Sequence, residues 1–357
     1  KSSKFEIDNA IRRVLDSGWY VLGQEVESFE REFSAFHGPN FHSVGVANGT
    51  DAITISLKCL NIEKGDEVIT TSHTAIATIA GIEQAGCKPV LADIDPITRC
   101  IDPSSIEKRI GPSTKAIIPV HIFGQPCDML EVVRIAKSNN LEIIEDCSQA
   151  HGAQIAGQFV GTFGSLATFS CYPTKNLGGT GDGGIILCNT NEHSEIIKSL
   201  RQYGWNQRRE SITSGQNSRL DEIQAAILRV KLKKLLSDNS RRREIGIQYN
   251  EAFKELPLTL PIRKANERHA MHLYVIECEK RSELLNCLRE QGVGASLHYP
   301  LAVHQHSAYS KRLRGSNDLA RTEKFYQRHL TLPMFPELSA DMLAKIISSV
   351  NEFFSPA

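Results

Sequence analysis

Residues 142–152 read Glu-Ile-Ile-Glu-Asp-Cys-Ser-Gln-Ala-His-Gly, a short apolar run that ends in a series of polar side chains. A run of this length is typical of a strand buried in a parallel sheet. Asp146 would then follow the carboxyl end of that strand, where ligands bind in open α/β sheets. We expect its carboxylate to point into a crevice; the alternative is an ordinary helix N-cap.

Six further short runs of this kind occur along the first half of the chain, at residues 43–47, 67–71, 89–94, 116–120, 167–170 and 184–188. Helical patterns cover residues 25–36, 51–60, 76–85 and 129–138. Strands and helices in alternation predict an α/β domain, with a mostly parallel central sheet covered on both faces.

The pattern changes after Arg219, where apolar residues recur at helical spacing. Strands are expected at residues 273–277 and 295–298, with helices at 282–291 and 341–354. The chain has 357 residues, more than one domain usually holds. We therefore predict a large domain over residues 1–235 and a smaller C-terminal α+β domain over residues 236–357.

Composition excludes several classes of function. Lys plus Arg equals Asp plus Glu, 41 against 41, so no excess charge favours a nucleic acid or a membrane as partner. No stretch approaches the ~18 apolar residues of a membrane span, and the first residues lack the layout of a signal peptide. The nine cysteines are scattered without a C-x-x-C pair. This pattern favours a reducing cytoplasm over a disulfide framework or a zinc site.

Two other strand ends carry groups that could bind a ligand. In Val-Ala-Asn-Gly-Thr-Asp, residues 46–51, Gly49 allows close approach, Thr50 offers a hydroxyl, and the N–H groups of a helix start attract an anion. A simple capped helix is the alternative. Residues 169–184, Phe-Ser-Cys-Tyr-Pro-Thr-Lys-Asn-Leu-Gly-Gly-Thr-Gly-Asp-Gly-Gly, place Ser170 and Lys175 before a glycine cluster. A single lysine on a turn is usually a solvated charge, but such glycines let the backbone pack closely around a large ligand.

Other motifs indicate less. The G-x-G-x-x-G at residues 179–184 precedes a strand and does not join a strand to a helix, so it is no dinucleotide site. His298, His304 and His306 match no metal-binding spacing, and we expect no metal. The basic runs at residues 231–234 and 241–243 are interpreted as solvated helix faces.

Four motifs in this order resemble the DegT/DnrJ-type family of nucleotide-sugar aminotransferases. They are Asn-Gly-Thr-Asp-Ala from residue 48, Glu-Asp-Cys-Ser-Gln-Ala-His-Gly from 145, Tyr-Pro-Thr-Lys-Asn-Leu-Gly from 172 with Gly-Asp-Gly-Gly from 181, and Asn-Ser-Arg-Leu from 217. The similarity extends over nearly the whole chain. It implies a homodimeric fold type I enzyme with shared active sites that uses pyridoxal 5'-phosphate (PLP).

The resemblance also implies roles for individual residues. Lys175 would be the Schiff-base lysine, Asp146 would hold the pyridine nitrogen, and Gln149 would lie near the phenolic oxygen of the ring. The phosphate contacts would come from Gly49, Thr50 and Ser170, and from Asn217 of the neighbouring subunit.

Further residues are expected around the ring and the substrate. Family members often place an aromatic residue over the ring where this chain has Ala75, so either His73 supplies that face or the ring is held less tightly. Residues expected near the substrate are Tyr172, His298, Tyr299 and His304.

The implied reaction is a ping-pong transamination. L-glutamate would give its amino group to the cofactor, and a nucleotide-linked keto-sugar would then accept it. The Tyr-Pro-Thr-Lys-Asn-Leu-Gly form resembles members that aminate C3 of a 3-keto hexose. The alternatives are a C4 keto-sugar, a keto-inositol, or a regulator that binds PLP or sugar without turnover.

Overall fold

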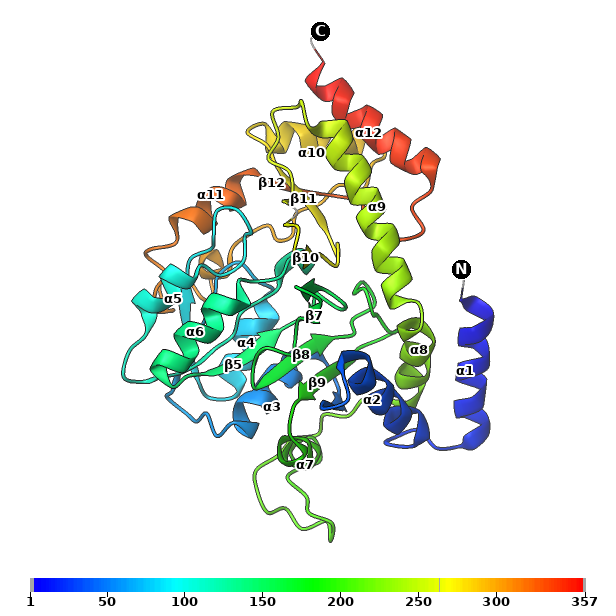
Figure 1. The fold of residues 1–357 in the computed structure, drawn as a ribbon, viewed down its shortest axis with the longest axis vertical. Coiled ribbons are helices and arrows are strands. Elements are labelled where there is room, and N and C mark those ends of the chain that lie inside the picture. The colour runs from blue at the N-terminus through cyan, green and yellow to red at the C-terminus, as the bar shows by residue number, and fades with distance from the viewer. Residues whose placement is uncertain (1–2, 263, 356–357) are drawn as a thin grey trace.

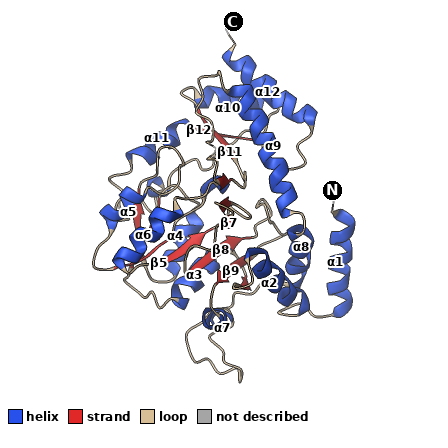
Figure 2. Cartoon of the chain, in the orientation of Figure 1, coloured by secondary structure: helices blue, strands red, loops and turns tan. Residues whose placement is uncertain are grey.

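A seven-stranded sheet forms the centre of the protein in a computed structural model that describes residues 3–262 and 264–355 (Figures 1 and 2). Its strands are β1 (His42–Val46), β2 (Glu67–Thr71), β3 (Lys88–Ala92), β4 (Thr114–Ile117), β5 (Glu142–Asp146), β8 (Leu166–Ser170) and β9 (Gly184–Cys188), in the order β1-β9-β8-β5-β4-β2-β3. All neighbours are parallel except β9, which is antiparallel to β1 and β8. The predicted α/β fold and its seven strands are confirmed.

Helices cover both faces of this sheet. One face packs against α2 (Gln24–His37), α5 (Pro103–Arg109) and α6 (Met129–Asn139). The other packs against α3 (Gly49–Cys59), α4 (Ile76–Gln84) and α7 (Asn191–Leu200). Along β5, Ile143 belongs to the first core and Ile144 to the second, as the alternation of side chains in a strand requires.

The C-terminal elements share another core, at the upper end of Figure 1. They are α9 (Leu235–Phe253), β11 (Tyr274–Glu277), α10 (Arg281–Glu290), β12 (His329–Leu332) and α12 (Ala340–Phe354). The chain between α10 and β12 returns to the central sheet, where Val303 and Leu319 pack against Ile79 and Leu91. The domain boundary at residue 235 stays a prediction, and it coincides with the start of α9.

Several elements differ from the expectation. Residues 295–298 do not form a strand; Ser296 makes a single bridge to Thr331 before the chain leaves β12. The partner of β11 is β12, which the sequence pattern did not reveal. Helix α1 (Lys4–Ser17) was not predicted either, and it packs against α8 (Glu222–Leu232) through Ala10, Val14 and Ala226.

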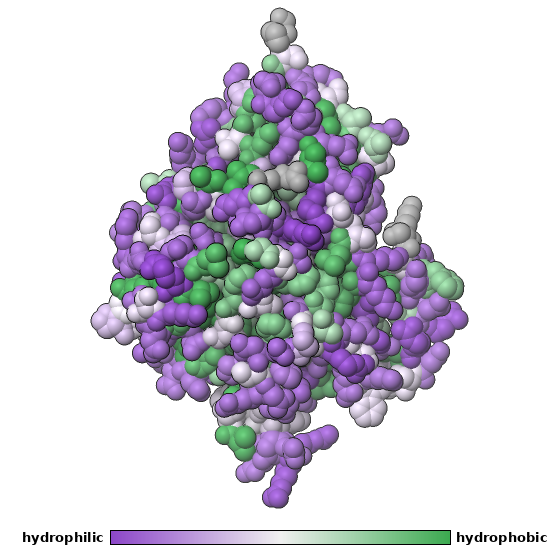
Figure 3. Space-filling view, in the orientation of Figure 1, coloured by the Kyte–Doolittle hydropathy of each residue, from purple (hydrophilic) through white to green (hydrophobic). Residues whose placement is uncertain are grey.

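Short elements complete the fold. They are α11 (Ala320–Arg328), the 3-10 turns Ile122–Gly124 and Val303–Gln305, and a small sheet of β6 (Gln154–Ile155), β7 (Gln158–Phe159) and β10 (Glu267–Arg268). Polar and apolar side chains alternate over the face shown in Figure 3. Within the described part of the chain, every helix is too short or too polar to traverse a bilayer.

Candidate active site

The carboxyl ends of β1, β5 and β8 border one cavity of about 240 Å³, which we call the strand-end cavity. Of the cofactor contacts expected from the same subunit, only His73 is missing from its lining. The residues that line it include Asn48, Gly49, Thr50, Thr74, Ala75, Thr78, Asp146, Ser148, Gln149, Ser170, Tyr172 and Lys175. Parallel strands bring their carboxyl ends to the same edge of the sheet, which explains why the motifs that contain Gly49, Asp146 and Ser170 meet here.

One end of this cavity is suited to an anion. Gly49 and Thr50 open helix α3, and Asn48 caps the helix by accepting the N–H of Asp51 at 2.8 Å. Ser170 lies so close that a Cβ on Gly49 would be 2.8 Å from the Ser170 Cβ. The end of β8 and the start of α3 therefore approach so closely that only glycine fits at residue 49. The Ser170 hydroxyl then lies beside the N-terminus of α3, which carries a partial positive charge.

Asp146 is held rigidly in the same cavity. The residue is buried, and its two carboxylate oxygens each accept a hydrogen bond. The Thr78 hydroxyl donates to Oδ2 at 2.9 Å, and the Ser148 N–H donates to Oδ1 at 3.1 Å. Thr74 and Thr78 share a further hydrogen bond of 2.8 Å. Thr78 was missed at the sequence level; its signal is the spacing of four residues from Thr74 at a strand-to-helix turn.

Lys175 lies where the strand-end cavity meets a second, larger one. Burial lowers the pKa of its ammonium group from 10.5 to about 8, although the Asp146 carboxylate raises it. The turn that carries Lys175 is tight, because a Cβ on Gly178 would be 2.6 Å from the Pro173 carbonyl oxygen. A lysine in this setting is neutral more often at neutral pH than a solvated lysine, and the neutral form can act as a nucleophile or a base.

The second cavity, of about 1050 Å³, we call the large cavity. Tyr172, His298 and Tyr299 line it, and their contact with a substrate stays a prediction. Lys231, Lys234 and Arg242 line it too, which corrects their interpretation as solvated helix faces. Arg242 is buried, with Nη1 donating to the Met334 carbonyl at 2.9 Å, and Lys231 donates to the Gly178 carbonyl at 2.6 Å.

Gln149 links the strand-end cavity to the C-terminal part of the chain. Its Oε1 accepts the N–H of Phe123 at 2.7 Å, and its Nε2 donates to the Tyr299 hydroxyl at 3.0 Å. Burial raises the pKa of Tyr299 to about 12, so the phenol stays protonated at neutral pH. His298 is fixed beside it by a hydrogen bond of 3.0 Å between its Nδ1 and the Thr331 hydroxyl.

Three expected site residues are not brought into either cavity. His73 is fully buried, with Nδ1 3.1 Å from the Tyr326 hydroxyl and its ring against Phe123 and Phe325. It therefore presents no stacking face, and Ala75 itself lines the strand-end cavity.

His304 and Asn217 are the other two. His304 is clamped between Ser72, at 2.7 Å from Nδ1, and Glu323, at 3.1 Å from Nε2, so it fastens the chain after α10 to the end of β2. Asn217 lies outside both cavities, where its Oδ1 accepts the Arg219 Nε–H at 2.9 Å.

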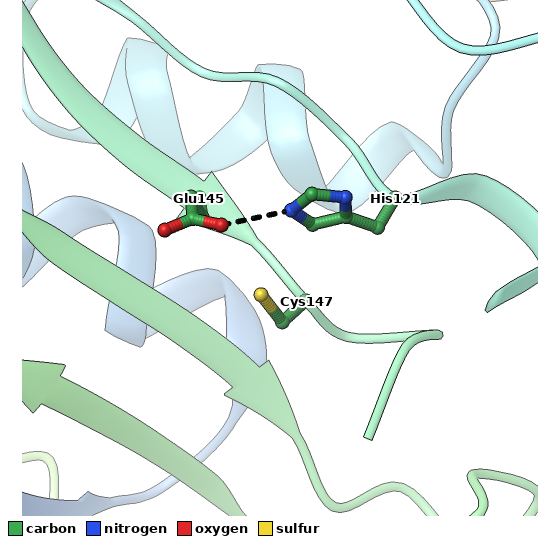
Figure 4. A group of neighbouring side chains, drawn as sticks. All are labelled: His121, Glu145 and Cys147. Carbon is green, nitrogen blue, oxygen red and sulfur yellow. Dashed lines mark hydrogen bonds and ion pairs between the residues drawn. The ribbon is translucent and has the colours of Figure 1, made fainter. Parts of the chain in front are cut away.

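His121, Glu145 and Cys147 form a buried group whose side chains are close enough to hold a metal ion (Figure 4). Hydrogen bonds already use the ligand atoms of His121 and Glu145. His121 Nδ1 accepts the N–H of Cys127 at 3.0 Å, so Nε2 carries the hydrogen and donates to Glu145 at 3.1 Å. Glu145 also accepts three backbone N–H groups, from residues 161, 163 and 164. The group fixes the loop of residues 161–164 against the end of β5, and thereby the position of the neighbouring Asp146.

Comparison with known proteins identifies relatives along the whole chain. The model of the DegT/DnrJ/EryC1/StrS aminotransferase family matches residues 1–351. The chain is 44% identical to the dTDP-3-amino-3,6-dideoxy-alpha-D-galactopyranose transaminase of Aneurinibacillus thermoaerophilus, over 98% of this chain and 95% of that protein. It is 38% identical to the UDP-N-acetyl-3-dehydro-alpha-D-glucosamine 3-aminotransferase of Acidithiobacillus ferrooxidans, over 97% and 93%. The structure of S. venezuelae DesV in complex with a ketimine intermediate has a TM-score of 0.96 at 40% identity, covering 100% and 96%.

Proposed function

The chain belongs to the DegT/DnrJ/EryC1/StrS aminotransferase family, and on that premise we propose that it transfers an amino group from L-glutamate to C3 of a nucleotide-linked 3-keto hexose. The observation that carries this proposal is the position of Lys175 between an anion-binding, Asp146-containing cavity and a larger cavity lined by cationic side chains. The first suits a phosphorylated cofactor, and the second suits a substrate with a diphosphate.

The residues of the strand-end cavity fit PLP. Thr50, Ser170 and the start of α3 would hold the phosphate, and the Gly49 approach to Ser170 leaves no room for a side chain there. Asp146 would hold the proton on the ring nitrogen, and Lys175 would carry the cofactor. Bound PLP supplies an electron sink for the negative charge that develops when a C–H bond is broken.

Lys175 would then do the proton transfer. With the amino donor bound in its place, the Lys175 Nζ would be a free amine in a site where burial lowers its pKa to about 8. This amine would take the proton from Cα of glutamate, hold it, and give it back within the same site. In the second half-reaction the same steps run in reverse with the keto-sugar, which gives ping-pong kinetics.

The nucleotide-linked sugar is supported by the large cavity. Its lining holds the cations Lys231, Lys234 and Arg242 together with the carboxylates of Asp238 and Glu337. Positive charge is in excess, and it would attract a diphosphate. Amination at C3 is supported by the names of the two relatives, one a transaminase of a 3-amino dTDP-sugar and the other a 3-aminotransferase of a UDP-sugar. Because one name gives dTDP and the other gives UDP, the substrate of this chain could carry either nucleotide.

A substrate panel tests this proposal. The purified enzyme, PLP and glutamate are mixed with dTDP- and UDP-linked 3-keto hexoses, dTDP- and UDP-linked 4-keto hexoses, and a free keto-inositol. We expect 2-oxoglutarate and an amino sugar with the 3-keto compounds. Turnover confined to the 4-keto sugars or the cyclitol would replace the proposed substrate, and no 2-oxoglutarate with any acceptor would favour a PLP-binding regulator.

We also propose a cytoplasmic homodimer with shared active sites. All nine cysteines are free, which fits a reducing compartment. The loop after α7 projects from the lower end of the molecule (Figure 1) and exposes Tyr203 and Ile212. Trp19 and Tyr20 are exposed as well. Asn217 closes the base of this loop, so it could reach the phosphate of a partner subunit.

Mixed dimers test the sharing of sites. Lys175→Ala and Asn217→Asp are each expected to be nearly inactive, the second because it adds a negative charge beside the phosphate. Co-expressed with different affinity tags and purified through both tags, the mixed dimers have one site of two with normal Lys175 and partner Asn217, so their activity should recover to about half of wild type. If Asn217 serves its own subunit, no site is intact and the mixture stays inactive.

The pKa of Lys175 predicts the pH dependence of reconstitution. Imine formation needs the neutral amine, so the rate at which the cofactor-free protein turns yellow with PLP should rise with pH and be half-maximal near 8. Because the Asp146 carboxylate raises this pKa, Asp146→Asn should move the midpoint to lower pH. A midpoint near the ordinary lysine value of 10.5 would show that Lys175 is solvated.

A further inference from the structure

The residue after the reactive lysine has a fixed amide orientation. Asn176 Nδ2 donates to the Ala270 carbonyl at 2.8 Å and to Asn239 Oδ1 at 2.8 Å. A carbonyl only accepts, so the atom facing Ala270 must be the nitrogen. Asn239 is fixed in the same way, because its Nδ2 donates to the His151 carbonyl at 2.7 Å. Asn176 Oδ1 is therefore an acceptor, and its direction is set.

This orientation determines the tautomer of His272. Its Nδ1 is 3.0 Å from Asn176 Oδ1, so Nδ1 must carry a hydrogen and donate it. The ring is buried, and burial, followed by the charges of Lys175 and Arg242, lowers its pKa well below 6.5, so the imidazole is neutral. A neutral ring with its hydrogen on Nδ1 has a lone pair on Nε2.

That lone pair is open to the large cavity. Nε2 forms no hydrogen bond with a described residue, and it is not one of the enclosed atoms left without a partner. The open space that the ring borders is the large cavity, which Lys175 also borders. His272 Nε2 is thus an uncharged acceptor on the cavity that the reacting lysine also borders.

We propose that His272 Nε2 accepts the hydroxyl hydrogen of the sugar carbon next to the keto group, which makes His272 a specificity-determining residue for the acceptor half-reaction. This inference rests on the proposed function. The sugar has hydroxyl donors beside its reacting carbon. Glutamate has none, because its carboxylates only accept hydrogen bonds and would be repelled by a lone pair. His272 should therefore contribute to one half-reaction and not to the other.

The half-reactions can be measured separately by stopped-flow absorbance. His272→Phe keeps the size of the ring and removes both nitrogens. We expect conversion of the PLP form by glutamate to keep its wild-type rate, which also shows that the variant is folded and loaded. The reaction of the aminated form with a dTDP-linked 3-keto hexose should fall roughly 3- to 10-fold in kcat/KM, the effect of one uncharged hydrogen bond. His42→Phe, at the remote start of β1, is the matched control.

Deoxy substrates identify the hydroxyl. The 2-deoxy and the 4-deoxy analogues of the same 3-keto sugar are compared with wild type and His272→Phe. The analogue that lacks the hydroxyl bound by His272 should react at the same rate with both proteins. Equal losses of rate in both half-reactions would overturn the proposal, because they would mean that His272 positions Lys175 and does not contact the sugar. No loss in either, or the same loss with every analogue, would overturn it as well. If the wild-type enzyme forms the aminated cofactor but reacts with no 3-keto sugar, the proposed function itself is wrong. That outcome differs from all those that overturn only the role of His272.

Discussion

Lys175→Ala is expected to lower turnover by roughly 10⁴-fold or more, because the change removes both the group that carries the cofactor and the base that moves the proton. The variant should still bind PLP through the phosphate and ring contacts at Thr50, Ser170 and Asp146. It should no longer be labelled when borohydride reduces the protein with its cofactor, which a mass spectrum of the intact chain detects.

The control for this result is Lys137→Ala, which removes an exposed lysine from the last turn of α6. It should keep wild-type turnover and labelling. The account would be contradicted if Lys175→Ala transaminated at the wild-type rate, or if the borohydride label stayed on another lysine.

Asp146→Asn is expected to reduce turnover by roughly 10²- to 10³-fold, since breaking a buried charge pair costs about 3–5 kcal/mol. The neutral amide cannot hold the proton on the ring nitrogen, and the ring then withdraws less charge. Thr78 O–H and Ser148 N–H would both face a group with one acceptor in place of two. Unlike Lys175→Ala, this variant should still be labelled by borohydride.

Kinetics of the glutamate half-reaction measure this effect without a sugar. Asp128→Asn, which retains a capping side chain at the start of α6, serves as the control. An Asp146→Asn enzyme with unchanged kinetics would mean that Asp146 is only a structural residue at the end of β5.

The sequence predicts the strand ends well because their signal is local. A short buried run followed by polar residues defines Asp146, Ser170 and Thr50, and parallel pairing brings such ends together. Thr78 escaped notice because a threonine in the first turn of a helix is common. Its role follows only from the distance to Asp146.

Side chains whose roles depend on packing were harder to predict. His73 stands two residues before Ala75, yet its ring packs between Phe123, Phe325 and Tyr326, away from the cavity. Lys231 and Arg242 have helical spacing that is equally typical of a solvated face. Neither the packing of His73 nor the position of α8 and α9 beside the large cavity is encoded in a local pattern.

The central claim is that a cofactor on Lys175 takes an amino group from glutamate and gives it to a 3-keto sugar. Absorbance spectra of the purified protein test it most directly. We predict a yellow lysine-bound form that loses its colour when glutamate is added and regains it when a nucleotide-linked 3-keto hexose follows. A protein that binds PLP but keeps an unchanged spectrum with glutamate would contradict the account.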